Sequence, residues 1–466
     1  MRLRTSGIAG LAGEDYLHFT IVAVKPLLPA LVSTILMIPM WGCGASAPLQ
    51  GHWTGTIEHA GAVAAVTFDV DGRLRGRLSA EDSGIFDVPV AVHADAADVD
   101  AEIVRSSGTV RFHGHRNGKV IEGLARVGDF IAHVHLEREG AEQSARFTEI
   151  ETSVPTATRR LGATLLMPIA THRVPAVVLI HGSHGPDRED LRGPASIFAR
   201  NGIAALIYDK RDLGADQSQP HRYSFRELAD DARAAVKVLR QRSDIDGDAV
   251  GIFGISEGGW VAPLVAESNR DVAFVLVVAA PAVSYAMVED VMTAAQLRAA
   301  DGSDADVAAM LRLFHQVNDY VRHGGEAGAL TAQLVAASHQ RWANSVAIPR
   351  RAPTTADIRT DVRWRELDYE PAEHWRRVQV PVFGAWGADD LHPVTESVAA
   401  IRSALGKDRH DVSLHVYPRA THELLVSSQR GSAWQWPRLA PGFIDDMIRW
   451  ATARSRRQQD GARHSH

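Results

Sequence analysis

The sequence has little cysteine, no long block of like charge and a single long apolar run. The one cysteine among 466 residues, Cys43, cannot form an intrachain disulfide, so stability must come from a hydrophobic core. The 56 acidic and 50 basic residues give a formal charge of −6 and form no basic stripe of the kind that binds nucleic acid. The apolar content of 45% is typical of a folded chain, and the length predicts about two or three domains.

The long apolar run covers residues 26–41, after three basic residues, and small residues follow it up to Ala47. A basic start, an apolar middle and a small-residue exit are typical of a bacterial export signal. Residues 1–43 are therefore expected to be an export or lipoprotein signal, because Cys43 stands in a segment that resembles a lipoprotein cleavage box. An uncleaved membrane anchor is the alternative. Either way, we expect an exported protein, secreted or held at the cell envelope through a lipid on Cys43.

Residues 44–150 alternate apolar and polar side chains and have almost no helical periodicity. Turn signals interrupt them about every ten residues, among them Asp71-Gly72 and Asn117-Gly118. The pattern predicts a separate all-β domain, either an antiparallel sandwich or a small barrel. We interpret it as a lid, a spacer or a partner surface.

Two pairs of histidines in this domain are spaced two residues apart, so each pair would share one face of a strand. They are His113 with His115 and His133 with His135. Such pairs can bind a metal, but no cysteine or carboxylate at ligand spacing accompanies them. We interpret them as the polar face of a strand.

A strand, a sharp turn and a helix follow one another around Ser256. An apolar run at 249–253 meets the G-x-S-x-G turn of Gly254 to Gly258, and a helix-compatible segment follows. A serine at the tip of so tight a turn takes strained backbone angles, so the residues two positions away must lack side chains. The turn also aims the backbone N–H of Glu257 at the place where an oxyanion would form. Ser256 is the candidate nucleophile and Glu257 a candidate oxyanion donor, with its carboxylate expected at the surface or the pocket rim.

Patterns of buried strands and helices alternate from residue 151 to 455. Continuous apolar runs such as 176–180 and 203–207 suit strands that are buried on both faces, and residues 225–242 form a strong amphipathic helix pattern. The alternation predicts a mostly parallel sheet covered by helices on both sides. The polar and basic tail, 456–466, is expected to be disordered.

These features together resemble the α/β-hydrolase superfamily, particularly its bacterial serine esterases and its prolyl-oligopeptidase-like or dienelactone-hydrolase-like branches. The resemblance covers roughly residues 160–455. It rests on three segments, His181 to Arg188, Tyr208 to Arg211 and Ser256 to Gly259. It implies that the loop after the first of these strands supplies a second oxyanion donor, the N–H of Ser183, and that residues 285–372 form a helical cap inserted before the acid.

The candidate acid and base follow the last two predicted strands. The resemblance favours Gly-x-x-Asp, which selects Asp390, whereas Asp389 is the alternative because Pro393 stands four residues after it. His422 follows the strand pattern at 412–417 and is the candidate general base. The order serine, acid, histidine is the one that this fold uses.

Two further histidines, His181 and His184, precede the nucleophile in the chain. The fold places its base after the acid, so we interpret both as scaffold or pocket residues.

The sequence thus predicts a serine hydrolase that cleaves carboxylic esters of small to medium acyl groups through an acyl-enzyme, with no metal or organic cofactor. A peptidase or amidase with the same triad is the near alternative. The alternative of another class is a non-catalytic envelope binding protein with a degenerate hydrolase body, whose β domain carries the function. The expected partner is a small-molecule acyl ester rather than nucleic acid.

Overall fold

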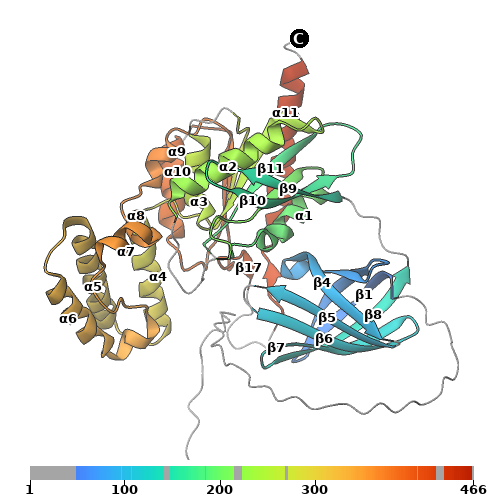
Figure 1. The fold of residues 1–466 in the computed structure, drawn as a ribbon, viewed down its shortest axis with the longest axis horizontal. Helices are drawn as coiled ribbons and strands as arrows, with labels where there is room; N and C mark the ends of the chain where they lie inside the picture. The colour runs from blue at the N-terminus through green and yellow to red at the C-terminus, as the bar shows by residue number, and fades with distance from the viewer. Residues whose placement is uncertain are drawn as a thin grey trace, which may run out of the picture. The chain divides into compact units, whose positions relative to one another are not determined.

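The computed structural model describes residues 49–95, 97–105, 108–140, 147–183, 185–214, 223–267, 271–406, 408–426 and 435–463 (Figure 1). The expected export signal, with Cys43, lies outside the described residues. Within the described ranges, none of the helices combines the length and apolarity that crossing a membrane requires.

Eight antiparallel strands form a closed barrel in which β1 pairs with β8 (Figure 1). The strands are β1 (Gly51–His59), β2 (Ala62–Val70), β3 (Arg75–Ala80), β4 (Ile85–Asp95), β5 (Asp98–Arg105), β6 (Gly108–Asn117), β7 (Val120–Val127) and β8 (Phe130–Gly140), with a short 3-10 helix, η1 (Glu81–Ser83), before β4. Of the two predicted architectures, the barrel is the one observed. Trp53 is fully buried in its core, and its indole N–H donates to the carbonyl of Leu49 at 2.9 Å.

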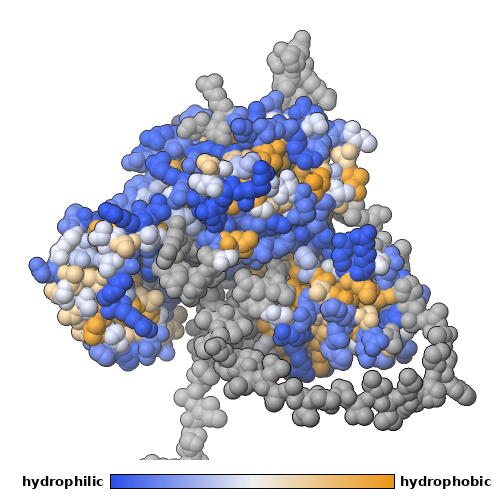
Figure 2. Space-filling view, viewed as in Figure 1, coloured by the Kyte–Doolittle hydropathy of each residue, from blue (hydrophilic) through white to orange (hydrophobic). Residues whose placement is uncertain are grey.

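Both predicted turns join neighbouring barrel strands, β2 to β3 and β6 to β7. At the first turn, the Asp71 carboxylate accepts hydrogen bonds from the backbone N–H groups of Arg73 and Arg75, which closes the loop locally. On the outside, large apolar side chains remain exposed at Val63 and Ile131, and Figure 2 shows apolar patches among hydrophilic ones over the barrel strands.

The second sheet has eight strands in the order β16-β15-β14-β13-β11-β12-β10-β9. Its strands are β9 (Phe147–Pro155), β10 (Arg160–Pro168), β11 (Val174–Ile180), β12 (Ala204–Tyr208), β13 (Ile245–Ile255), β14 (Val275–Val278), β15 (Val382–Gly387) and β16 (Val412–Tyr417). Strands β11 to β16 are parallel, and β9 and β10 form an antiparallel edge. This is the predicted mostly parallel sheet. Strand β9 crosses the boundary predicted at residue 150, because its alternating pattern does not reveal which sheet it joins.

Helices cover both faces of this sheet, as Figure 1 shows. They are α1 (Arg192–Arg200), α2 (Phe225–Arg240), α3 (Gly258–Ala266), α10 (Val394–Leu405) and α11 (Phe443–Arg463). Along β11, Val178 packs in one core with α2, α3 and α10, whereas the next residue, Leu179, packs in the other core with α1 and α11. The continuous apolar runs of the sequence are therefore explained by burial on both faces.

A series of helices interrupts the sheet between β14 and β15. They are α4 (Tyr285–Ala299), α5 (Asp304–His323), α6 (Ala327–Ser338), the 3-10 helix η3 (Arg341–Ser345), α7 (Thr355–Thr360), α8 (Val362–Arg365) and α9 (Pro371–Trp375). Residues 293–352 belong to a separate compact unit. Within it, α5 begins at a capping box formed by Ser303 and Asp306, and it buries Met310 and Val317. The short elements that remain are η2 (Arg188–Leu191), β17 (Leu425–Val426) and β18 (Arg438–Leu439).

The C-terminal segment corrects one expectation. Residues from 456 onward were expected to be disordered, but α11 continues to Arg463. Alanine, arginine and glutamine, which have high helix propensity, make up much of this segment, so it extends a helix whose preceding turns pack on the sheet. Residues 464–466 lie outside the described residues.

Candidate active site

Ser256 stands between β13 and α3 with a backbone φ of +52°, in the left-handed region that is costly for a residue with a side chain. Steric contacts leave no room for a side chain at either glycine of the turn. A Cβ on Gly254 would lie 2.4 Å from the carbonyl oxygen of Gly258, and a Cβ on Gly258 would lie 2.8 Å from that of Ile180. The strained turn thus depends on the G-x-S-x-G spacing seen in the sequence.

The loops that follow β15 and β16 lie against each other. A Cβ on Gly387 would lie 2.1 Å from the carbonyl oxygen of Ala420, so only glycine permits this approach. The backbone N–H of Asp389 donates to the same oxygen at 2.9 Å. This contact brings Asp390 of one loop beside His422 of the other, although 32 residues separate them.

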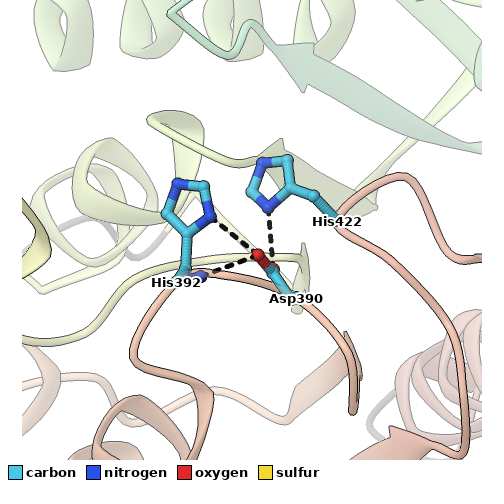
Figure 3. Close-up of side chains that lie close together, drawn as sticks. All are labelled: Asp390, His392 and His422. Atoms are coloured by element: carbon cyan, nitrogen blue, oxygen red, sulfur yellow. Dashed lines mark hydrogen bonds and ion pairs between the residues drawn. The ribbon is translucent and has the colours of Figure 1, made fainter. Parts of the chain in front are cut away.

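Ser256, His422 and Asp390 form a continuous chain of hydrogen bonds. His422 Nδ1 lies 2.7 Å from Asp390 Oδ2 (Figure 3). His422 Nε2 lies 3.0 Å from Ser256 Oγ. Because an ionised carboxylate only accepts, Nδ1 carries the proton, and Nε2 is left to accept from the serine hydroxyl. Asp389 is exposed, so Asp390 is the carboxylate of the two that contacts the histidine.

His392 also contacts this carboxylate, and the sequence reasoning missed it. Its backbone N–H and its Nδ1 donate to Asp390 Oδ1 at 2.9 and 2.7 Å. Its ring stacks on His422 with centroids 4.1 Å apart, and Figure 3 shows both imidazoles directed at Asp390. The available signal was its position two residues after the acid, where an aspartate commonly accepts a backbone hydrogen bond.

Burial and hydrogen bonding act in opposite directions on this cluster. Burial alone would raise the pKa of Asp390, but the hydrogen bonds from His392 and His422 outweigh it and hold that pKa well below its usual range. Burial would lower the pKa of His422, but its hydrogen bond to Asp390 and the charge of that carboxylate raise it above 6.5. Asp390 is therefore ionised throughout the physiological range.

The ligand-type atoms of Asp390, His392 and His422 all lie within 4.8 Å of one another, close enough for a metal site. In the hydrogen-bonded arrangement, however, the Nδ1 atom of each imidazole bears the proton that it donates to the carboxylate. A protonated ring nitrogen has no lone pair for a metal, so the geometry fits a hydrogen-bonded cluster better than a ligand set.

The two predicted oxyanion donors belong to residues beside the nucleophile. A Cβ on Gly182 would lie 3.3 Å from Ser256 Cβ and 3.9 Å from its Oγ, so the chain that leads into Ser183 packs against the serine. Glu257 follows Ser256 directly and precedes the first residue of α3.

The side chain of Glu257 contradicts the expectation of a surface or rim position. It is buried, and its Oε1 lies 2.7 Å from Lys210 Nζ. The Tyr223 hydroxyl donates to its two carboxylate oxygens at 3.1 and 3.0 Å. A carboxylate enters a protein interior when a partner of opposite charge and hydrogen bonds replace water, and Lys210 supplies both. No local pattern links these residues, which lie far apart in the sequence.

His181 is buried and directs Nε2 to the carbonyl oxygen of Tyr208 at 2.6 Å. Burial lowers the pKa of His181 to about 4, so the ring is neutral at physiological pH. These contacts agree with the expected scaffold role. His184 lies outside the described residues.

Comparison with known proteins matches residues 171–429, more than half of the chain, to the family described as "Serine aminopeptidase, S33". The thiohydrolase aneE of Aspergillus aculeatus is 34% identical over 89 residues, which cover 19% of this chain and 28% of that protein. The esterase EstD of Thermotoga maritima is 29% identical over 166 residues, 31% of this chain and 40% of that protein. The chain thus spans less than half the length of these relatives.

Among solved structures, the α/β hydrolase GrgF from Penicillium aligns with a TM-score of 0.42 at 16% identity, over 67% of this chain and 99% of that one. The parallel sheet, the helices on both of its faces and the strained serine turn after β13 are all present in the matched region. The chain belongs to the serine aminopeptidase S33 family of α/β-hydrolases.

Proposed function

We propose that this protein is a serine hydrolase that cleaves carboxylic esters of small to medium acyl groups. The observation that carries the proposal is the hydrogen-bond chain from Ser256 through His422 to Asp390. It offers a hydroxyl nucleophile, a neutral base in contact with it and a buried carboxylate that orients the base.

The reaction follows from these contacts. His422 Nε2 removes the hydroxyl proton as Ser256 Oγ bonds to the acyl carbon, and Asp390 stabilises the imidazolium that forms. The N–H groups of Glu257 and Ser183 hold the oxyanion, each worth about 3 kcal/mol in comparable sites. The C–O bond to the alcohol then breaks, and His422 returns the proton to the departing oxygen. Water attacks the acyl-enzyme with His422 again as base, which releases the carboxylic acid and restores the serine hydroxyl.

Hydrolysis of an amide or peptide bond is the second candidate. The description of the matched family as a serine aminopeptidase favours it. The names of two relatives, a thiohydrolase and an esterase, favour thioesters and esters. All three reactions pass through the same acyl-enzyme, so the leaving group distinguishes them.

The test is hydrolysis of p-nitrophenyl esters from acetate to palmitate, beside aminoacyl p-nitroanilides, by the chain from residue 44 onward. We expect the Ser256→Ala and His422→Ala variants to lose about 10⁴-fold or more in kcat, the usual result of removing a triad member. Ser153→Ala is the matched control, because its hydroxyl accepts from Arg160 on the edge strands β9 and β10. It should keep wild-type activity.

Each contrary result points to a different alternative. Anilides cleaved faster than every ester would establish the amidase. A wild type that is inactive on all substrates, with Ser256 unlabelled by a fluorophosphonate, would overturn the proposal in favour of a non-catalytic protein.

A further inference from the structure

The ammonium group of Lys210 lies in the protein interior next to the nucleophile turn, with its side chain only 3% exposed. Its Nζ lies 2.8 Å from the carbonyl oxygen of Gly182, 2.6 Å from the Tyr223 hydroxyl and 2.7 Å from Glu257 Oε1. An ammonium has three N–H donors, and these three oxygens occupy all of them. Such saturation fixes the position of the group relative to each of its partners.

The first partner, Gly182, belongs to the peptide group that carries one of the two proposed oxyanion donors. The carbonyl of Gly182 and the N–H of Ser183 are two ends of the same peptide group. The described chain has no cis peptide bond, and in a planar trans peptide the C=O and the N–H point in opposite directions. A hydrogen bond that fixes the carbonyl therefore also fixes the direction of the Ser183 N–H. A positive charge at the carbonyl polarises the peptide and strengthens that N–H as a donor.

The second partner, Glu257, carries the other proposed oxyanion donor. The Glu257 carboxylate is held by Lys210 and by Tyr223, while the backbone N–H of the same residue is the other proposed donor. Glu257 has helical φ and ψ angles of −49° and −33° at the start of α3. Anchoring its side chain limits rotation of this first turn, and with it the direction of the N–H.

We propose that Lys210 is a positioning residue that fixes the direction of both oxyanion donors. It acts on the Ser183 N–H through the Gly182 carbonyl and on the Glu257 N–H through the Glu257 side chain. This assignment rests on the proposed function. Because Lys210 and Glu257 carry opposite charges 2.7 Å apart, the pair adds little net charge at the oxyanion. Its contribution is the orientation and polarisation of peptide groups, which matter most when charge develops in the transition state.

The backbone around Lys210 supports the same loop. The N–H of Lys210 donates to the carbonyl of Pro186 at 2.8 Å, and His181 contacts the carbonyl of Tyr208 at 2.6 Å. The segment that ends in Lys210 thus holds the Gly182 loop at both sides. These backbone contacts do not involve the lysine side chain. A substitution of Lys210 should therefore free the Gly182–Ser183 peptide to rotate while the rest of the loop keeps its position.

The experiment is the Lys210→Met variant, which keeps the length of the side chain and removes its donors. We expect kcat per titrated active site to fall by about 10²-fold, the effect of losing an oxyanion donor, with KM changed by less than about twofold. The affinity for an alkylboronic acid, which forms a tetrahedral adduct on an active serine, should fall by a similar factor. A merely structural role would lower the active fraction but leave both quantities unchanged per active site.

Arg211→Met is the matched control. Arg211 is the next residue and forms comparable ion pairs, at 2.8 Å to Asp231 and 2.8 Å to Glu227. Its side-chain hydrogen bonds in the described structure go to these two residues and not to Gly182 or Glu257. We expect this variant to lose stability while kcat and boronate affinity stay within about twofold of wild type.

The double variant Lys210→Met/Glu257→Gln separates folding from positioning. It removes the buried carboxylate charge that Lys210→Met leaves without a counter-charge, so its unfolding temperature should rise above that of Lys210→Met. The Gly182 carbonyl remains unanchored, so kcat should stay low. Recovery of kcat together with stability would overturn the assignment, and so would a Lys210→Met enzyme with wild-type kcat and boronate affinity. A wild type that is inactive and unlabelled at Ser256 would instead overturn the proposed function, and the assignment with it.

Discussion

The barrel and the mixed sheet both pair histidines with carboxylates at nearly the same distance, but in different surroundings. On the outer face of the barrel, His113 Nδ1 lies 2.8 Å from Asp100 Oδ1, and the histidine side chain is 74% exposed. In the mixed sheet, His422 Nδ1 lies 2.7 Å from Asp390 Oδ2, and the aspartate side chain is 1% exposed. Distance alone therefore does not distinguish a surface ion pair from a candidate catalytic pair.

The difference lies in burial and in a third partner. Water competes with the barrel pair on all sides, so its contribution to stability is small. Asp390 is shielded from water and held by two imidazoles, and the free nitrogen of one of them contacts Ser256. Only the second arrangement can maintain one tautomer of the histidine against solvent. The predictions below test this contrast.

The largest effect is expected from Asp390→Asn. An amide of the same shape no longer stabilises the imidazolium and favours the wrong tautomer of His422, so we expect kcat to fall by about 10⁴-fold, as in comparable triads. The neighbouring Asp389→Asn, on an exposed carboxylate, is the control and should stay within about twofold of wild type. Ester kinetics of the two variants provide the measurement. Equal losses in both, or a larger loss in Asp389→Asn, would be incompatible with the observed geometry.

A smaller effect is expected from pH. His422 must be neutral to act as a base, and its pKa is raised above 6.5 by Asp390, so kcat/KM should fall about tenfold per pH unit below an inflection that lies above 6.5.

Stability over the same range should change in the opposite sense. A raised folded-state pKa means that the contribution of His422 to stability is fully present below 6.5 and is lost as the pH rises through its folded value. The pKa of Asp390 is lowered, so this carboxylate contributes fully to stability at pH values above 3.8, its usual pKa. That contribution is lost only as the pH falls below 3.8 and through the lowered pKa. If lowering the pH reduced activity and thermal stability in parallel, this interpretation would be contradicted.

The smallest effect is expected on the barrel. His113→Gln removes one member of an exposed pair, so we expect the free energy of unfolding to change by no more than about 0.5 kcal/mol and the ester kinetics to stay at wild-type values. Denaturant unfolding and steady-state kinetics measure the two quantities. A substantial loss of activity would show that the barrel face takes part in the reaction and that the contrast drawn above is wrong.

Local sequence signals account for much of the site. The glycines around Ser256, and the ends of the strands that precede Asp390 and His422, are short-range features, and the topology of a parallel sheet brings such loops to one edge. The sequence favours Asp390 over Asp389 only through the resemblance, because spacing does not show which carboxylate turns toward His422. That direction follows from contacts between two loops, such as the approach of Gly387 to Ala420.

Long-range features lay beyond the sequence. Alternating strands predict a sandwich or a barrel equally well, and the choice depends on the pairing of β1 with β8 at opposite ends of the domain. The burial of Glu257 depends on Lys210, 47 residues away, so its side chain alone suggested an exposed position. His392 is the intermediate case, since it is close to Asp390 in sequence but stacks on a histidine from another loop.

The most direct test of the central claim is to label the protein with a fluorophosphonate and to locate the adduct by peptide mass spectrometry. The account predicts a single stoichiometric adduct on Ser256 in the wild type, no adduct in Ser256→Ala, and much slower labelling in His422→Ala. An unlabelled Ser256 in folded wild-type protein, or an adduct on a different serine, would contradict it.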